Sequence, residues 1–140
     1  MATKTIDSIK FLQKIGNSVR SDDRNGCALI ATAVVSGLPY SEVYDMYKRL
    51  GRRHGRGTPI KACRRVMERI GATRLREYTI AGLVSKPGGK NPTVLQFSKQ
   101  NPVGTFFLLV RGHALAVVDG KIYDNLTTKR ARIYEAWRVK

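Results

Sequence analysis

The chain has 140 residues, of which 42% are hydrophobic and 8% aromatic, enough for one domain with a buried core; this composition excludes a disordered chain. No apolar run approaches the about 18 residues that cross a bilayer, and the N-terminus lacks the apolar region of a signal peptide. We therefore expect no membrane partner and no export by a signal peptide. The formal net charge of +16, from 26 basic and 10 acidic residues, indicates contact with a polyanion or an acidic protein surface.

The positive charge is concentrated between Lys48 and Arg76, where eleven basic residues accompany one acid, Glu68. Glycines separate several of these residues, which would let guanidinium groups approach phosphates closely. The candidate polyanion-binding residues are Arg52, Arg53, Arg56, Lys61, Arg64, Arg65 and Arg69. The alternative is that they are ordinary solvated helix faces. Because no sequence-reading motif is present, we expect any nucleic-acid contact to be unspecific.

Helical periodicity dominates the first half of the chain. The expected helices cover residues 5–15 (from an N-cap at Thr5), 26–37, 39–50 and 58–70. Residues 26–37 are apolar on nearly every side, so a buried strand is the alternative there, although the alanines and Gly37 favour a helix. Cys27 then lies in the first turn of this helix.

The second half of the chain has β-type patterns. We expect a weak strand at residues 74–79, a loop at 86–92, a short helix at 93–100 and strands at 105–110, 113–118, 121–124 and 132–139. Helices followed by an antiparallel sheet predict one α+β domain. We divide residues 1–140 into an N-terminal helix and extension (1–19), a helical half (20–72) and a sheet half (103–140).

The stretch from Arg111 to Asn125 is typical of a β-hairpin with a two-residue Asp-Gly turn. That turn pairs residue 118 with 121, which places His113 and Asp124 on one face as diagonal neighbours and Asn125 on the other. A carboxylate beside an imidazole fixes its orientation. A three-residue or bulged turn would instead give the partner role to Asn125.

Cys27 is the candidate nucleophile. A cysteine at a helix N-terminus lies in the positive end of the helix dipole, which favours the thiolate. The chain order Cys27, His113, Asp124 is that of papain-like peptidases. Each residue alone is more often structural, and Cys63, on an apolar helix stripe, is expected in the core. The two cysteines have no metal-ligand spacing, so we expect no metal and no disulfide framework.

Several blocks in order carry a family resemblance: residues 25–33, 37–44, 51–58, 92–97, 101–104 and 112–120. They resemble a family of small proteins of tailed bacteriophages that is itself similar to papain-like, peptidase C39-like cysteine hydrolases. The resemblance implies a papain-like fold and a Cys-His-Asp/Asn site that needs no cofactor. Papain-like enzymes usually carry an oxyanion-stabilising Gln about six residues before the nucleophile, where this chain has Ser21. The side chain of Asn25 and the backbone N–H of Cys27 are the expected donors instead.

Two functions follow as hypotheses. The first is a papain-like cysteine hydrolase that cleaves a peptide or isopeptide bond in a protein substrate. The second is a papain-fold protein without effective catalysis that binds nucleic acid or phage structural proteins through its basic face. Either one would act in the host cytoplasm or in the virion.

Overall fold

A computed structural model describes residues 5–20, 23, 25–78, 91–126 and 128–139. Within them the fold is α+β, with five helices and a mixed sheet of six strands. The helices are α1 (Ser8–Lys14), α2 (Cys27–Ser36), α3 (Tyr40–Arg49), α4 (Ile60–Arg69) and α5 (Val94–Gln100). The strands are β1 (Thr5–Asp7), β2 (Thr73–Arg74), β3 (Thr105–Val110), β4 (His113–Val118), β5 (Lys121–Asp124) and β6 (Ile133–Arg138). None of the helices in these residues has the length and apolar character needed to span a membrane.

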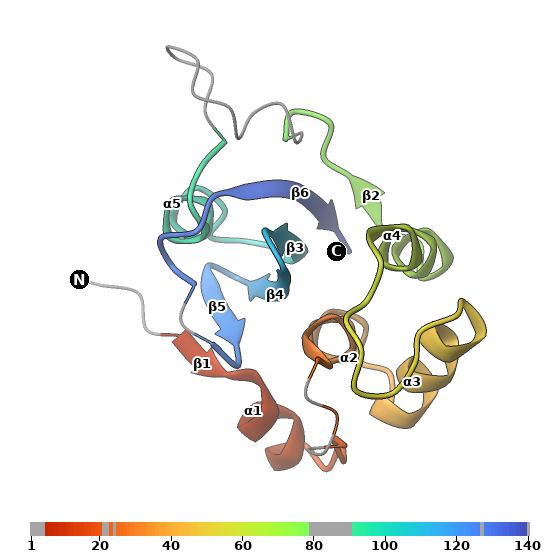
Figure 1. The fold of residues 1–140 in the computed structure, drawn as a ribbon. Helices are drawn as coiled ribbons and strands as arrows, with labels where there is room; N and C mark the ends of the chain where they lie inside the picture. Colours follow the sequence, from red (N-terminus) through yellow and green to blue (C-terminus); the bar gives the residue numbers. More distant parts are fainter. Residues whose placement is uncertain (1–4, 21–22, 24, 79–90, 127, 140) are drawn as a thin grey trace.

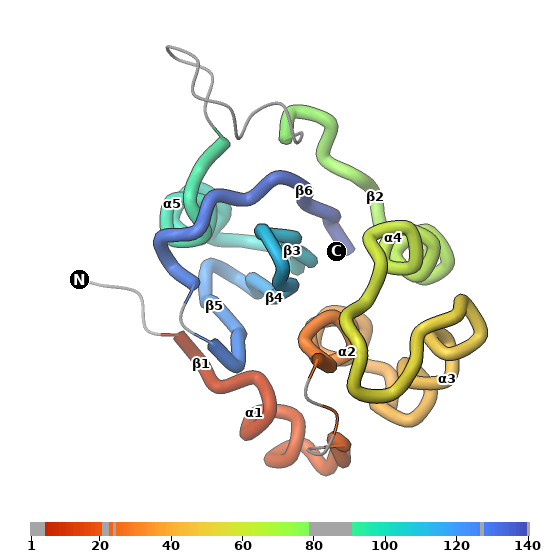
Figure 2. Tube along the Cα trace, in the orientation of Figure 1, coloured from red at the N-terminus to blue at the C-terminus, as the bar shows by residue number. Residues whose placement is uncertain are grey.

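The helices lie on both sides of the sheet (Figures 1 and 2). The strand order is β1-β5-β4-β3-β6-β2, and α2 packs on its centre against β4 and β3. Helix α3 lies outside α2, α4 lies beside α3 next to β2, and α5 covers the opposite face. The alternating side chains of β3 and β4 therefore enter two cores: Phe107 and Ala116 join the helical core, while Leu108 and Leu115 join the core beneath α5.

The helical interpretation of residues 26–37 is confirmed. Helix α2 has seven buried residues, and Gly37 ends it in a left-handed conformation with φ 72°. A helix that is apolar on all sides is stable only when it is surrounded, and α2 lies between the sheet and α3. The expected helices after Pro39 and Pro59 also form, as α3 and α4. Thr93 caps α5 with a capping box completed by Gln96.

The prediction of one helix from Thr5 is wrong. Residues 5–7 form β1, which pairs in parallel with β5, and the carboxylate of Asp7 caps α1 by accepting from the N–H groups of Ile9 and Lys10. The spacing of the apolar residues fits a helix, but it carries no information about the exposed edge of β5, with which residues 5–7 pair. The expected strand at 74–79 is reduced to β2, and Thr79 and the loop at 86–90 lie outside the described residues.

Candidate active site

Cys27 is the first residue of α2 and is half-buried. Its backbone N–H has no acceptor within the helix because the first turn has no preceding carbonyl groups. Gly26 comes before it in a crowded position, where a Cβ atom would lie 3.2 Å from the hydroxyl oxygen of Tyr40. The nucleophile candidate thus begins a buried helix directly after a residue whose position is tight for a side chain.

His113 and Asp124 meet at the ends of neighbouring strands. His113 begins β4, Asp124 ends β5, and the imidazole Nε2 lies 2.5 Å from Asp124 Oδ1. Asp124 is 3% exposed and also accepts from the backbone N–H of Leu126 at 3.1 Å and the hydroxyl of Thr128 at 2.5 Å. A carboxylate held from three sides can fix the orientation of the imidazole.

The predicted hairpin register is confirmed. Val118 pairs with Lys121, and the intervening Asp119 and Gly120 have φ values of 49° and 77°, as in a two-residue type I′ turn. Because the turn has two residues, the alternation of side chains places Asp124 on the same face as His113, and the two are hydrogen-bonded. Asn125 is exposed. The alternative third member, Asn125, is therefore not in the position that orients the imidazole.

The thiol of Cys27 and the imidazole of His113 stabilise each other's charged forms. Burial raises the pKa of Cys27, but the neighbouring imidazole of His113 and the backbone N–H groups of Ala114 and Ala28 together hold that pKa below its ordinary value. Burial lowers the pKa of His113, yet the hydrogen bond with Asp124 and the neighbouring thiol of Cys27 raise it to about 9. Because Nε2 faces Asp124, Nδ1 is the nitrogen left for the thiol. This arrangement favours a thiolate–imidazolium pair.

A cavity of about 460 Å³ opens beside Cys27 and His113. Gly57 and Gly112 are among its lining residues, one from the basic loop before α4 and one from the turn before β4. The rest of the lining is mostly apolar: Ala28, Pro59, Ile60, Cys63, Leu109, Ala114 and Tyr134. An extended chain with small or apolar side chains fits such a cavity, and the glycines allow its backbone to approach closely.

Asn25 lies at this cavity, as the oxyanion prediction requires. Its side-chain amide donates to the carbonyl of Gly55 at 2.7 Å, which uses one of the two N–H groups of that amide. The second N–H and the backbone N–H of Cys27 are the donors that remain for an oxyanion. Ser21, where papain-like enzymes carry Gln, lies outside the described residues.

A buried ion pair that the sequence analysis missed links the segment before Cys27 to the basic loop. The guanidinium of Arg52 donates to both carboxylate oxygens of Asp23 at 2.7 Å, and the two side chains are 2% and 0% exposed. Arg52 also donates to the carbonyl of Asn25 and the hydroxyl of Thr58, while the N–H of Gly55 donates to Asp23. The pair therefore fixes both Asn25 and one wall of the cavity. In the sequence, Asp23 lies in a polar loop and Arg52 lies 29 positions away, and no local pattern indicates that they pair.

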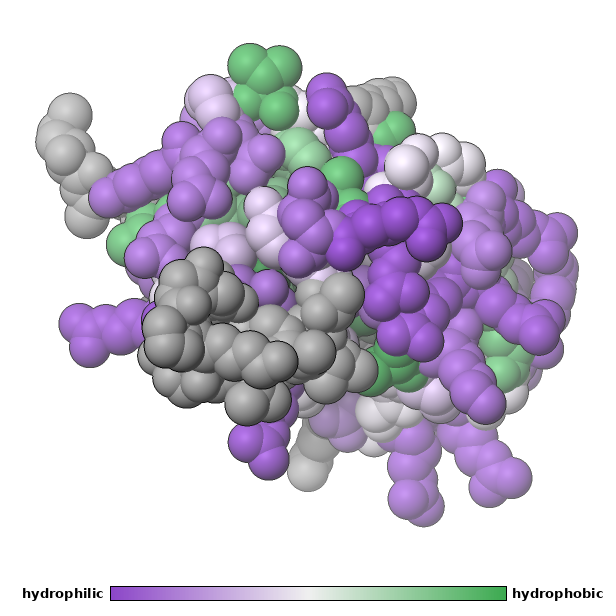
Figure 3. Space-filling model, turned by 90° about the horizontal axis from the view of Figure 1, so that it is seen from above, coloured by the Kyte–Doolittle hydropathy of each residue, from purple (hydrophilic) through white to green (hydrophobic). Residues whose placement is uncertain are grey.

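Two of the polyanion-binding candidates have partners within the protein. Arg52 forms an ion pair with Asp23. Arg64 forms an ion pair with Glu135 in β6. Glu135 is fully buried, forms a second ion pair with Arg74 and accepts a hydrogen bond from Trp137. A buried carboxylate needs such partners because an unpaired one is costly. The other candidates are exposed: Arg53, Arg56, Lys61, Arg65 and Arg69. Figure 3 shows hydrophilic side chains extending outward on the side where α3 and α4 lie.

Cys63 lies in the core as expected, and burial raises its pKa to about 12. The thiol is therefore protonated and inert at neutral pH. Within the described residues no cluster of three or more histidine, cysteine or acidic side chains is arranged to hold a metal ion.

Replacing Asp124 with asparagine is expected to lower the pKa of His113 from about 9 by at least about one unit, because the imidazolium loses its carboxylate partner. NMR titration of the His113 ring measures this shift. The matched control is Asn125→Ala, one residue further along and exposed, which should leave the titration unchanged. Equal titration curves for the wild type and Asp124→Asn would contradict the assignment of Asp124.

Comparison of the chain with protein-family models, with curated proteins and with solved structures found no match. The interpretation of this site therefore depends on its own geometry.

Proposed function

We propose that the protein is a papain-like cysteine hydrolase that cleaves peptide or isopeptide bonds. The observation that carries the proposal is that Cys27 and His113 line one cavity, where Asp124 holds the imidazole, the thiol pKa is lowered and the imidazole pKa is raised. A purely structural cysteine at a helix start needs neither a charged imidazole nor a buried carboxylate behind it. The same arrangement fits the resemblance to phage-encoded cysteine hydrolases.

In the proposed reaction the Cys27 thiolate attacks the carbonyl carbon of the scissile amide. The carbonyl oxygen becomes an oxyanion that the Cys27 N–H and the free Asn25 N–H stabilise. The His113 imidazolium gives its Nδ1 proton to the departing amine as the C–N bond breaks, and a thioester to Cys27 remains. A water molecule then gives its proton to His113 and attacks the thioester, which releases the carboxylic acid and regenerates the thiolate–imidazolium pair.

Asp124 has no proton to transfer in this scheme. It holds the imidazole so that Nδ1 faces the thiol, and it stabilises the positive charge on the ring. Thr128 and the N–H of Leu126 hold the carboxylate itself in place. His113 thus acts as acid and base, and Asp124 acts only through His113.

A binding protein without catalysis has less support. Two of the seven basic residues expected to contact a polyanion, Arg52 and Arg64, make internal ion pairs instead. Arg52 in particular supports the segment that carries Asn25 and Cys27. The basic segment is therefore partly explained by the architecture of the candidate active site.

The proposal is tested with mixed-sequence libraries of quenched fluorescent peptides and isopeptide-linked dipeptides. We expect cleavage by the wild type, loss of cleavage in Cys27→Ala, and a covalent adduct on Cys27 with a peptide aldehyde that mass spectrometry locates. Cleavage that survives in Cys27→Ala would contradict the assignment of the nucleophile. Absence of both cleavage and adduct would contradict catalysis itself and favour the binding alternative.

A further inference from the structure

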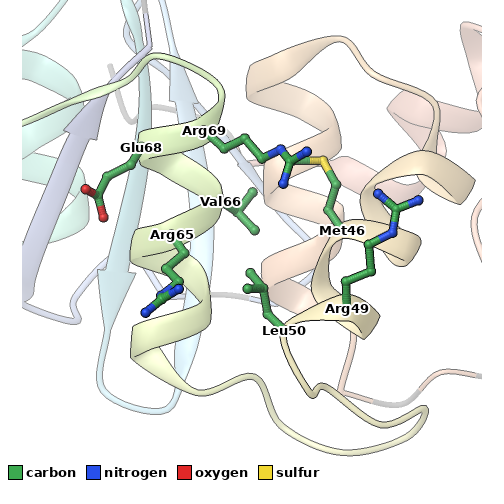
Figure 4. A pocket seen from close by; sticks show the side chains of 7 residues that line it. All are labelled: Met46, Arg49, Leu50, Arg65, Val66, Glu68 and Arg69. Carbon is green, nitrogen blue, oxygen red and sulfur yellow. The ribbon is translucent and has the colours of Figure 1, made fainter.

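A second hollow, of about 480 Å³, lies between α3 and α4 and shares no lining residue with the cavity at Cys27 (Figure 4). Its apolar side chains are Met46, Leu50 and Val66, and Leu50 is 37% exposed. Leaving a leucine and a methionine partly exposed in a hollow costs hydrophobic free energy that an apolar partner group would recover.

Three arginines surround this apolar floor: Arg49 from the end of α3, and Arg65 and Arg69 from α4. All three are exposed, and within the described part of the chain none of their guanidinium groups has a hydrogen bond or an ion pair. Arg65 and Arg69 are four residues apart on one helix, an arrangement in which like charges repel. An anionic partner would relieve that repulsion.

The acidic residues nearby leave this side of the hollow positive. In Figure 4, Glu68 points away from α3, while Arg69 extends across the gap toward Met46. Glu42 and Asp45 line an adjoining hollow together with Arg49 and Arg69. Carboxylates of a partner are therefore attracted to Arg49, Arg65 and Arg69. They are repelled by Glu42 and Asp45 at the adjoining hollow.

We propose that this hollow binds an acidic protein segment in which an apolar side chain is flanked by carboxylates. The apolar side chain lies on the partly exposed Met46 and Leu50, and methionine adapts readily to the shape of a partner. The carboxylates accept from Arg49, Arg65 and Arg69, whose planar guanidinium groups match carboxylate geometry. The lining has no aromatic ring on which a base would stack, so the chemistry favours a protein segment over single-stranded nucleic acid.

Binding is tested with a fluorescein-labelled peptide that carries two leucines flanked on each side by two glutamates. The Cys27→Ala chain is used so that the peptide cannot be cleaved, which makes the result independent of the proposed hydrolase function. Fluorescence anisotropy is expected to show saturable binding that weakens with added salt. Peptides with glutamine in place of glutamate, or alanine in place of leucine, should each bind at least about tenfold more weakly.

The double variant Arg65→Gln/Arg69→Gln should lose about tenfold in affinity, about 1.4 kcal/mol in total, because it removes two of the three guanidinium groups that bind the carboxylates. The matched control is Arg53→Gln/Arg56→Gln, which removes two exposed arginines that do not line this hollow and should change affinity less than about twofold. Circular dichroism confirms that both variants fold. Absence of binding, equal losses in the two double variants, or tighter binding of an oligonucleotide of equal charge would overturn the proposal.

Discussion

Iodoacetamide is expected to alkylate Cys27 faster than an ordinary thiol at pH values below 9.0, where most of an ordinary thiol is protonated. The thiolate forms above the pKa of Cys27, which lies below its ordinary value of 9.0 because His113 and the N–H groups of Ala114 and Ala28 favour the anion. His113 keeps its proton up to about pH 9. Between these two pKa values both partners are charged, so the alkylation rate should form a plateau across this window.

Removing the imidazole tests the same pair. In His113→Ala the thiol loses its largest favourable interaction, so its pKa should rise and alkylation at pH values below 9.0 should become slower. Peptide mass spectrometry supplies an internal control, because buried Cys63, with a pKa of about 12, should stay unlabelled in both proteins. A wild-type rate that rises only near the pKa of a free thiol, together with no effect of His113→Ala, would contradict the ion pair.

The same pair predicts how the proposed hydrolysis depends on pH. Activity should fall at low pH as Cys27 is protonated, and it should fall again as the pH rises through about 9, because His113 then has no proton for the leaving amine. Product formation by wild-type protein across pH measures both limbs.

Asp23→Asn is expected to lower the free energy of unfolding by about 3–5 kcal/mol, the usual cost of removing one partner of a buried ion pair. Arg52 would stay 5% exposed with no carboxylate, and Gly55 would lose a charged acceptor. Urea unfolding followed by circular dichroism measures the loss. Because Asp23 belongs to the same network as Asn25, the variant should also slow alkylation of Cys27 if the network positions the start of α2.

The control for this variant is Arg56→Gln, which removes an exposed charge from the same loop and should change stability by less than about 0.5 kcal/mol. The ion pair also predicts a pH dependence. Although burial raises the pKa of Asp23, Arg52 and the Gly55 N–H hold it below 3.8, so its stabilisation is present above that pH and is lost as the pH falls through the folded-state value. Equal stabilities of the wild type and Asp23→Asn at neutral pH would show that the ion pair contributes no net free energy.

The sequence by itself determined the features that depend on near neighbours in the chain. The alanines and Gly37 predicted that the apolar run at 26–37 is a helix, and Thr93 predicted the start of α5. The two-residue turn at Asp119 and Gly120 determined the register that joins His113 to Asp124. The face on which a side chain lies follows from local periodicity once the turn is known. For this reason the sequence predicts that Asp124, and not Asn125, lies beside His113, and these two side chains are hydrogen-bonded.

Only the tertiary structure decided which distant residues meet. The parallel pairing of residues 5–7 with β5 overrode their helical spacing, and the pairing of Asp23 with Arg52 converted an expected polyanion contact into a support for the loop at Cys27. Both depend on partners 29 or more positions away, and a charge pattern cannot distinguish a solvated arginine from a buried one. Burial makes that distinction, because a carboxylate removed from water must find a cation, and the fold determines which cation is within reach.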